Sequence, residues 1–112
     1  MSNNIYDLAN ELERSIRLLP EYKAVEAAKL EIEADAEAKT IFEDYLAFQT
    51  ELQGLLQSGQ MPSPDVQKRM EEIHQKVEKN RVVSEYFSKQ QQLSIYMSDL
   101  EKIIFRPLRD LL

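Results

Sequence analysis

The sequence of 112 residues contains no cysteine, no tryptophan and only two glycines. Without cysteine, these residues form no disulfide, no thiolate metal site and no cysteine nucleophile, which suits a cytoplasmic protein. The shortage of glycine, and of alternating valine and threonine, argues against a β-sheet protein. No apolar run approaches the ~20 residues needed to span a bilayer. The opening Met-Ser-Asn-Asn has no basic segment followed by an apolar core, so we expect no secretion signal and a cytoplasmic location.

The charge balance is acidic, with 20 aspartates and glutamates against 14 lysines and arginines, for a net charge of −6. Such a chain repels phosphate backbones, so we expect neither direct nucleic-acid binding nor membrane binding. Hydrophobic residues make up 43 % of the sequence, and alanine, leucine, glutamate, lysine and glutamine favour helix. The composition predicts an all-α fold in a single helical domain over residues 1–112.

A cluster of helix-breaking residues lies near the middle of the chain, at Ser58–Asp65. It contains Gly59, Pro62 and Pro64, and a long run with helical periodicity lies on each side. Breakers between two periodic runs are typical of the bend of a helical hairpin. We therefore predict a long antiparallel α-hairpin that bends near residues 58–65.

The first half of the sequence predicts a helix over about residues 4–18, capped by Ser2, Asn3 or Asn4 and ended by Pro20. Its apolar stripe is Ile5, Leu8, Ala9, Leu12 and Ile16. A short second helix is expected from Pro20 to Asp35, with a stripe of Tyr22, Val25, Ala28 and Ile32. The two short helices flank the predicted hairpin.

Asp35 is predicted to cap a third helix that ends near Gln57. This helix carries an apolar seam of alternating three- and four-residue spacings. The seam is Ala38, Ile41, Tyr45, Phe48, Leu52 and Leu55, and it is widened by Phe42, Leu46 and Leu56.

After the bend, Ser63 is expected to cap a fourth helix and Pro64 to occupy its first position. Asn80 marks either a cap or a kink, and a fifth helix then runs to about Phe105, where Pro107 breaks it. The stripe of the fourth helix is Val66, Met70, Ile73 and Val77. The fifth helix has Val82 or Val83, Tyr86, Phe87, Leu93, Met97, Leu100 and Ile104 on one side, with Ile95, Tyr96 and Ile103 widening it.

The two halves of the sequence align at a shift of 45 residues. Lys23, Glu26 and Glu33 then fall on the identical residues Lys68, Glu71 and Glu78, and Asp35 falls on Asn80. Each half therefore reads as a short helix, a capping Asp or Asn, and a long helix. Shared helical periodicity alone produces some of the apolar matches, so both a duplication and a coincidence of pattern remain open.

The last long helix carries more apolar residues than one stripe holds, because Tyr96 and Ile103 lie away from the Leu93–Leu100 line. An amphipathic helix is stabilised mainly by packing of its apolar face, and a second copy is the simplest partner. We expect a homodimer or higher oligomer forming a helical bundle, the alternative being a compact monomer. The candidate interface residues are Phe42, Tyr45, Phe48, Leu52, Tyr86, Phe87, Leu93, Tyr96, Met97, Leu100, Ile103 and Ile104.

Reactive constellations are scarce in this sequence. His74 is the only histidine, and with Glu71 it forms a single Glu-x-x-His motif, whereas di-metal helical bundles use two such motifs and further glutamates. The sequence has no Gly-x-Ser-x-Gly elbow, phosphate-binding glycine loop or dinucleotide fingerprint. We therefore predict a non-enzymatic protein with no catalytic, cofactor-binding or metal-binding residues and no cofactor.

Several packing positions resemble the YlbF/YmcA family of small bacterial proteins, most closely its YheA-like branch. The resemblance covers most of the chain and is carried by Leu8-Ala9 to Leu12, Pro20-Glu21-Tyr22, Asp35 with Ile41-Phe42, Phe48-Gln49 to Leu52-Gln53, Asn80 to Val82, and Leu100 to Ile103-Ile104. It implies an all-helical fold dominated by a long α-hairpin, with intertwined dimers. Some relatives hold iron–sulfur clusters through cysteines, which this sequence lacks, so that property is not carried over.

The family resemblance also implies a function. Relatives are non-enzymatic regulators that join a multiprotein complex influencing RNA processing by an endoribonuclease, and through it competence, sporulation and biofilm formation. We therefore expect a regulatory adaptor that acts through contact with another protein, whose identity the sequence does not give. The alternatives are a holdase-like helical clamp, for which the bend offers only Met61, and a metal-binding helical bundle.

Overall fold

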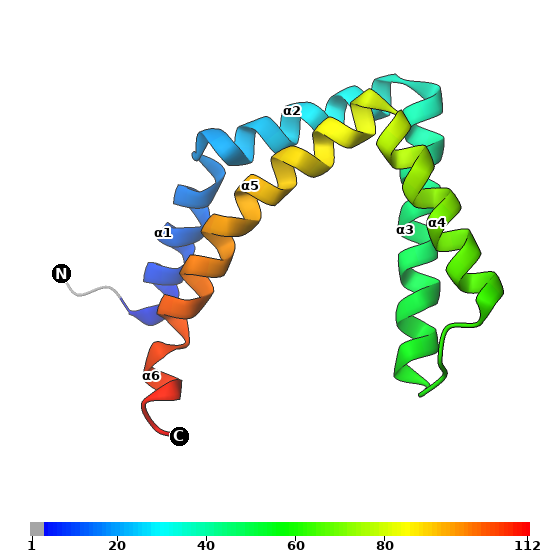
Figure 1. Cartoon of the computed structure of the whole chain (residues 1–112). Coiled ribbons are helices and arrows are strands. Elements are labelled where there is room, and N and C mark those ends of the chain that lie inside the picture. Colours follow the sequence, from blue (N-terminus) through cyan, green and yellow to red (C-terminus); the bar gives the residue numbers. More distant parts are fainter. Residues whose placement is uncertain (1–3) are drawn as a thin grey trace. The chain divides into compact units, whose positions relative to one another are not determined.

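A computed structural model describes residues 4–112, and all regular structure in that range is α-helical (Figure 1). The helices are α1 (Ile5–Arg17), α2 (Pro20–Ala34), α3 (Ala36–Gln57), α4 (Pro64–Lys79), α5 (Arg81–Ile104) and α6 (Arg106–Arg109). The predicted all-α fold class is thus confirmed for the described residues. Two of the expected capping candidates, Ser2 and Asn3, lie outside them.

The helix starts are set by short polar side chains that accept hydrogen bonds from first-turn backbone amides. Asn4 Oδ1 accepts from the backbone amide of Asp7 at 2.8 Å and so caps α1. Ser63 Oγ accepts from the amide of Val66 at 3.2 Å, and Pro64 occupies the first turn of α4. These caps agree with the sequence-based assignments, because capping depends on local sequence alone.

Two helical runs are each interrupted by a single residue that is neither proline nor glycine. Asp35 separates α2 from α3, and its Oδ1 accepts from the amide of Ala38 at 3.1 Å. Asn80 separates α4 from α5, and its Oδ1 accepts from the amide of Val83 at 3.1 Å. Both residues have extended backbone, with ψ of 115° and 111°. The 45-residue shift seen in the sequence therefore relates two equivalent helix breaks.

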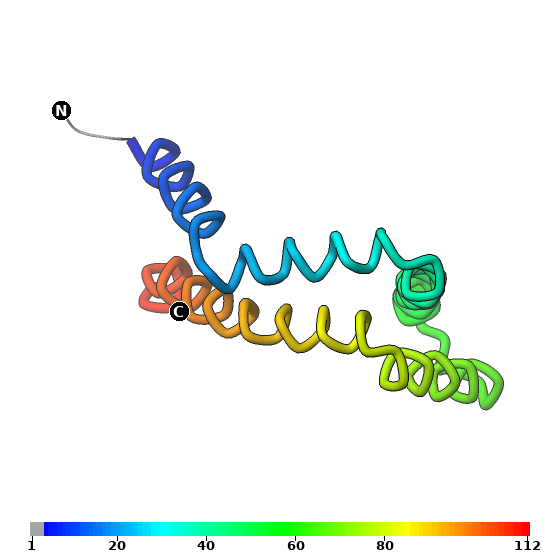
Figure 2. The backbone as a smooth tube through the Cα atoms, turned by 90° about the horizontal axis from the view of Figure 1, so that it is seen from above, coloured from blue at the N-terminus to red at the C-terminus, as the bar shows by residue number. Residues whose placement is uncertain are grey.

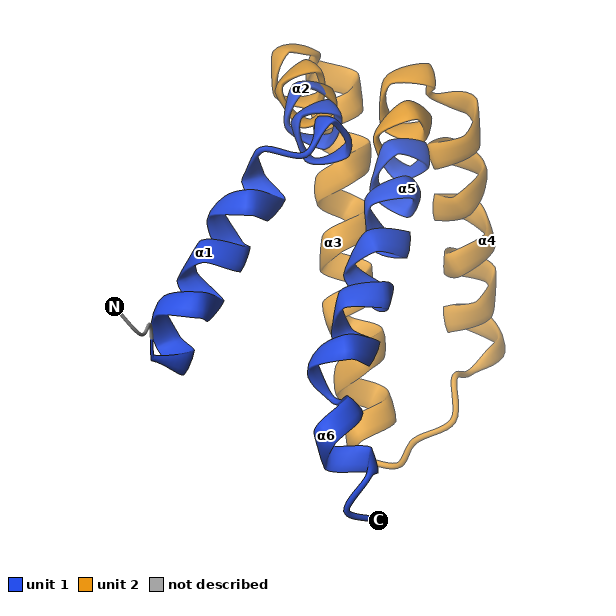
Figure 3. Ribbon diagram, turned by 90° about the vertical axis from the view of Figure 1, so that its left-hand side faces the viewer, with its two compact units in different colours: residues 1–27, 87–112 blue, residues 28–86 orange. Residues whose placement is uncertain are grey.

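The chain divides into two compact units, shown in Figure 3. Unit 1 comprises residues 1–27 and 87–112, and unit 2 comprises residues 28–86. The unit boundaries fall inside α2 and α5 rather than at the helix breaks. The expected single domain over residues 1–112 stays a prediction.

The buried core of the described residues lies entirely in unit 2. Ala38 and Val83, each three residues after a capping residue, are both 0 % exposed. The rings of Phe42 and Tyr86 meet edge to face with centroids 5.1 Å apart. The buried set is Ala28, Ile32, Ala38, Phe42, Phe48, Val83 and Tyr86. The core therefore gathers around the two helix breaks.

Helices α3 and α4 are joined by residues 58–63 and lie side by side (Figure 1). Gly59 has a φ of 79°, a left-handed conformation that glycine adopts without steric cost. Farther along the pair, the Arg69 guanidinium donates two hydrogen bonds to the Glu51 carboxylate, at 3.0 and 2.9 Å. The same guanidinium lies 5.3 Å from the ring centre of buried Phe48. This double contact fixes the register of α3 against α4.

The C-terminal end differs from the expected simple break at Pro107. Helix α5 ends at Ile104, but the short helix α6 follows and contains Pro107 in its first turn. Proline is tolerated there because first-turn amides have no partner within the helix. Arg109 Nη2 donates to the backbone carbonyl of Lys102, which lies in the last turn of α5. Pro107 thus lies at the start of a new short helix and does not end helical structure at this point.

Removing either internal cap should destabilise the fold. We expect Asp35→Ala and Asn80→Ala each to lower the free energy of unfolding by about 1 kcal/mol, because each leaves a first-turn amide unpaired beside the core. Urea unfolding followed by circular dichroism measures the loss. The matched control is Asn4→Ala, which removes the same kind of cap from α1, a helix with no buried residue. An equal decrease in the free energy of unfolding in all three variants would contradict the larger contribution expected of the two internal caps.

Tyr86 should make stability fall at alkaline pH. Burial raises the pKa of the Tyr86 phenol above its ordinary value of 10.0, and the neighbouring Tyr45 adds a smaller electrostatic contribution in the same direction. The unfolded chain then loses this proton first, so stability is full below pH about 10 and declines as pH rises through the folded pKa. We expect Tyr86→Phe to flatten that decline in urea titrations, and Tyr45→Phe to flatten it less. If the free energy of unfolding of the wild type and of Tyr86→Phe fell identically with alkaline pH, the assigned role of Tyr86 would be contradicted.

Candidate interaction surface

Unit 1 has no buried residue among its described positions, 4–27 and 87–112. Large apolar side chains on its surface include several that are more than half exposed. The exposed set is Ile5, Tyr6, Leu8, Leu18, Ile95, Tyr96, Met97, Ile103, Ile104, Phe105, Leu108, Leu111 and Leu112. Isolated exposed apolar residues are ordinary, whereas a concentration of them is typical of surfaces that contact other molecules.

Helix α1 carries an apolar stripe that the rest of unit 1 leaves largely uncovered. Ile5 is 75 % exposed and Leu8 is 53 % exposed, while Leu12 and Ile16 are half-buried. Figures 2 and 3 show α1 diverging from α5 and α6. A helix of 13 residues is marginal in water unless its apolar face packs. The apolar stripe of α1 is therefore left partly exposed to solvent in the single chain.

Helix α5 is covered only along part of its length within unit 1. Glu21, in the first turn of α2, accepts a hydrogen bond at 3.4 Å from the Tyr96 hydroxyl of α5. Leu93 and Leu100 are half-buried, but every residue from 101 to 112 is exposed. The end of α5 and all of α6 thus form an apolar surface that lies open in the single chain.

The twelve predicted interface residues fall into three groups. Phe42, Phe48 and Tyr86 are buried in the core of unit 2, within the single chain. Five are half-buried: Tyr45, Leu52, Phe87, Leu93 and Leu100. Four are exposed: Tyr96, Met97, Ile103 and Ile104. For all twelve residues, a role in an interface stays a prediction.

Other exposed apolar residues were missed by sequence reasoning. Ile5 and Leu8 belong to a stripe that looks like any core-facing stripe, because periodicity identifies an apolar face without saying what covers it. Tyr6 is exposed as well but is not part of that stripe. Phe105 ends the predicted fifth helix, and Leu108 follows Pro107, where the prediction placed the helix break; both are exposed. A helical pattern continuing past Pro107 was the signal that could have found them.

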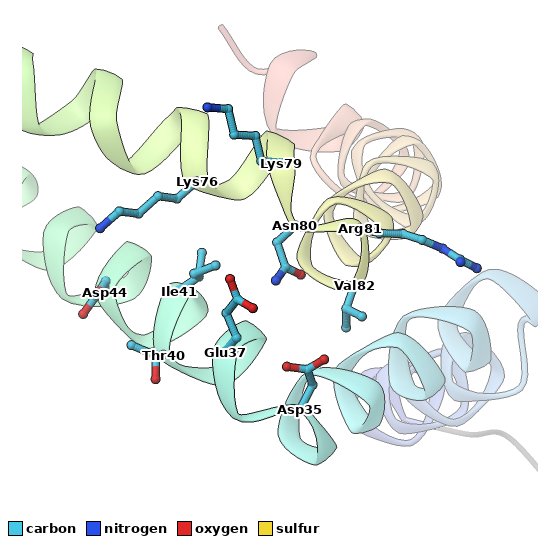
Figure 4. Close-up of a pocket in the computed structure, with 10 residues that line it drawn as sticks. All are labelled: Asp35, Glu37, Thr40, Ile41, Asp44, Lys76, Lys79, Asn80, Arg81 and Val82. Carbon is cyan, nitrogen blue, oxygen red and sulfur yellow. The ribbon is translucent and has the colours of Figure 1, made fainter.

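A depression of about 700 Å³ lies between the two helix breaks of unit 2 (Figure 4). Its floor is partly apolar, and its charged residues are three acids and three bases. The lining residues are Asp35, Glu37, Thr40, Ile41, Asp44, Lys76, Lys79, Asn80, Arg81 and Val82. This depression is the largest hollow among those described on unit 2.

Two of the polar groups that line the depression cap helices. Figure 4 shows Asp35, Glu37 and Asn80 pointing into the space between the breaks, whereas Lys79 and Arg81 point away. Asp35 and Asn80 each use one oxygen to cap a helix. No nucleophile with an adjacent base lines the depression. Asp35 and Asn80 therefore help to hold the two helix breaks in place.

His74 does not join a metal-binding cluster. Its Nε2 lies 3.6 Å from Glu78 Oε1, one turn along α4, and its side chain is 72 % exposed. Across residues 4–112, no group of three or more His, Asp or Glu side chains is placed to hold a metal ion. Over the same residues, no helix combines the length and apolar character required to cross a membrane.

Curated relatives of nearly the same length match the chain over its whole extent. A UPF0342 protein of Streptococcus sanguinis is 60 % identical over 110 residues, covering 98 % of each chain. A UPF0342 protein of Streptococcus gordonii is 56 % identical over 110 residues with the same coverage. A UPF0342 protein of Streptococcus suis is 58 % identical over 112 residues, covering 100 % of both chains. These names state no activity.

One similar solved structure is a protein of unknown function (DUF964) from Bacillus stearothermophilus. It has a TM-score of 0.84 and 22 % identity, and the match covers 96 % of this chain and 94 % of that one. At this identity the likeness shows the fold alone. Residues 5–109 match the family described as "Control of competence regulator ComK, YlbF/YmcA". This match spans most of the sequence, and the chain therefore belongs to the YlbF/YmcA family.

Proposed function

We propose that this protein is a homo-oligomeric adaptor that regulates by binding another protein and catalyses no reaction. The observation that carries the proposal is the concentration of exposed apolar side chains in unit 1, where no described residue is buried. Leaving apolar area in water costs roughly 25 cal/mol per Å². A surface of that kind is retained where another surface covers it.

A second copy is the first partner that this surface suggests. Closed two-fold dimers are the commonest assembly of soluble proteins, and they need only one self-complementary surface. Helix α1 and the end of α5 would bury the most additional apolar surface on self-association, because α1 has no buried residue and residues 101–112 are all exposed. Self-association would thus complete the packing of both.

A regulatory role is supported by the family, whose description is the control of a competence regulator. The chemistry of the described residues supports contact over catalysis, since they include no group of three or more His, Asp or Glu side chains placed to hold a metal ion. The net charge of −6 favours a protein partner over nucleic acid. The adaptor would act while bound to a target protein, with its own copies paired.

A charge placed in the exposed apolar surface should weaken self-association. We expect Ile104→Asp, at a side chain 55 % exposed, to raise the dissociation constant at least about tenfold, because the carboxylate would be desolvated in the interface. Sedimentation of the full chain at micromolar concentration measures this. The control is Leu30→Asp, at a side chain 67 % exposed in unit 2. A wild-type particle of one 13.1 kDa chain would contradict the homo-oligomer.

The adaptor function is tested by affinity recovery of the native protein followed by mass spectrometry. We expect the same protein to be recovered with the wild type and with Leu30→Asp, in a reproducible amount relative to the chain itself. Recovery of nothing except the chain itself, under conditions that preserve weak complexes, would contradict the adaptor while leaving the homo-oligomer intact.

A further inference from the structure

We propose that a hollow on unit 1 binds an arginine side chain of the protein that this adaptor contacts. The inference rests on the proposed adaptor function and names the chemistry of one contact that the target protein would make. The hollow has a volume of about 440 Å³. Its lining residues, which all belong to unit 1, are Glu21, Gln92, Ile95, Tyr96 and Asp99.

Helices α2 and α5 together form this hollow. The lining residues Gln92, Ile95, Tyr96 and Asp99 lie on α5, within an arc of about 100° around the helix axis. Glu21 lies in the first turn of α2 and is half-buried. Its Oε2 accepts a hydrogen bond from the Tyr96 hydroxyl at 3.4 Å. The two helices thus place a carboxylate and a phenol next to each other at the hollow.

The charged groups of the lining are all of one sign. Glu21 and Asp99 contribute carboxylates, and among the described residues no lysine or arginine lines the hollow. Within residues 4–112, neither carboxylate forms an ion pair. The nearest lysines along α5, Lys89 and Lys102, lie three residues outside the lining segment. Two carboxylates without a basic partner favour a cationic occupant.

The apolar part of the lining selects the kind of cation. Ile95 is 62 % exposed and Tyr96 is 42 % exposed, so both offer apolar surface to an occupant. An arginine side chain packs its methylene stem on such surface, stacks its guanidinium on an aromatic ring and donates up to five hydrogen bonds. The carboxylates of Glu21 and Asp99 and the side-chain oxygen of Gln92 are the available acceptors. The lining therefore matches each part of an arginine side chain.

Charge complementarity assigns the arginine to a different protein. Each copy of this chain carries a net charge of −6, so a second copy is repelled at long range, whereas a basic surface is attracted. Ile95 and Tyr96 also belong to the exposed apolar surface of unit 1 on which the proposed function rests. A bound target would cover this apolar surface and place a guanidinium in the hollow at the same time.

Nuclear magnetic resonance of the isotope-labelled full chain tests the hollow with a defined probe. N-acetyl-arginine amide is titrated into the protein at constant ionic strength, and N-acetyl-citrulline amide, which has nearly the same shape without the charge, is the matched control. We expect saturable shifts of the backbone amides of Gln92, Tyr96 and Asp99 with the arginine probe and none with the citrulline probe. An equal response to both probes, or no response to either, overturns the proposal. Tighter binding of N-acetyl-lysine amide overturns the assignment to a guanidinium.

Neutral variants show whether the carboxylates bind the probe. We expect Asp99→Asn to raise the dissociation constant of the arginine probe about threefold, and the double variant with Glu21→Gln to raise it about tenfold. The matched control is Glu101→Gln, since Glu101 is exposed on the same helix about 200° around from Asp99. We expect the control to bind the probe as the wild type does. Unchanged binding by the double variant, with its helix content intact by circular dichroism, overturns the site.

Replacement of the ring tests the stacking contact separately. We expect Tyr96→Leu to raise the dissociation constant of the arginine probe about threefold, because the aromatic face is lost. Tyr96→Phe keeps the ring and should stay within about twofold of the wild type. Equal weakening by the two substitutions would contradict stacking on the ring.

Sedimentation of Asp99→Asn separates the hollow from the proposed homo-oligomer. We expect its self-association to equal that of the wild type, because the arginine comes from a different protein. Weaker self-association would show that the second copy supplies the cation, and this overturns the assignment to a target protein. A chain that recovers a specific protein but does not bind the arginine probe overturns the hollow and leaves the adaptor standing. A chain that binds the probe but recovers no other protein overturns the adaptor and the target, and leaves a guanidinium site alone.

Discussion

The fold depends on two hydrogen bonds that break helices without proline or glycine. Asp35 and Asn80 each turn a side-chain oxygen back onto an amide three residues ahead, at 3.1 Å in both cases. Their extended backbone changes the chain direction between α2 and α3 and between α4 and α5. The residues that receive these bonds, Ala38 and Val83, are fully buried. The helix caps and the core of unit 2 are thus linked, because the residues whose amides are capped also belong to the core.

Much of this fold could be read from the sequence because its signals are local. Ser63 with Pro64 gives the start of α4, and Asp35 gives the start of α3, since a cap needs only its own first turn. Burial was harder to predict. Phe48 and Tyr96 are both aromatic residues on apolar helical stripes, yet Phe48 is 2 % exposed and Tyr96 is 42 % exposed. Periodicity gives the face of a helix, while burial depends on which distant element lies against it.

Tight packing and exposed apolar surface lie in different parts of this molecule. The side chains that pack tightly, such as Phe42 against Tyr86, lie in unit 2, whereas α1 and the end of α5 in unit 1 present their apolar residues to solvent. Substitutions in the two units should therefore separate in their effects. We expect changes in unit 2 to lower the free energy of unfolding and changes on the exposed face of unit 1 to weaken the proposed association, so the proposed function can be tested separately from stability.

Electrostatics restricts how two such chains can meet. Each copy carries a net charge of −6, so two copies repel one another at long range. Beyond the screening length of about 8 Å at physiological salt, that repulsion fades, and contact is decided by the charges at the interface itself. The end of α5 and the residues after it carry both signs in equal number, with Asp99, Glu101 and Asp110 against Lys102, Arg106 and Arg109, so the local charge is balanced although the chain as a whole is acidic. Added salt should then relieve the general repulsion between two copies. In the proposed homo-oligomer, the exposed apolar side chains of unit 1, which salt does not screen, supply the part of the association that persists.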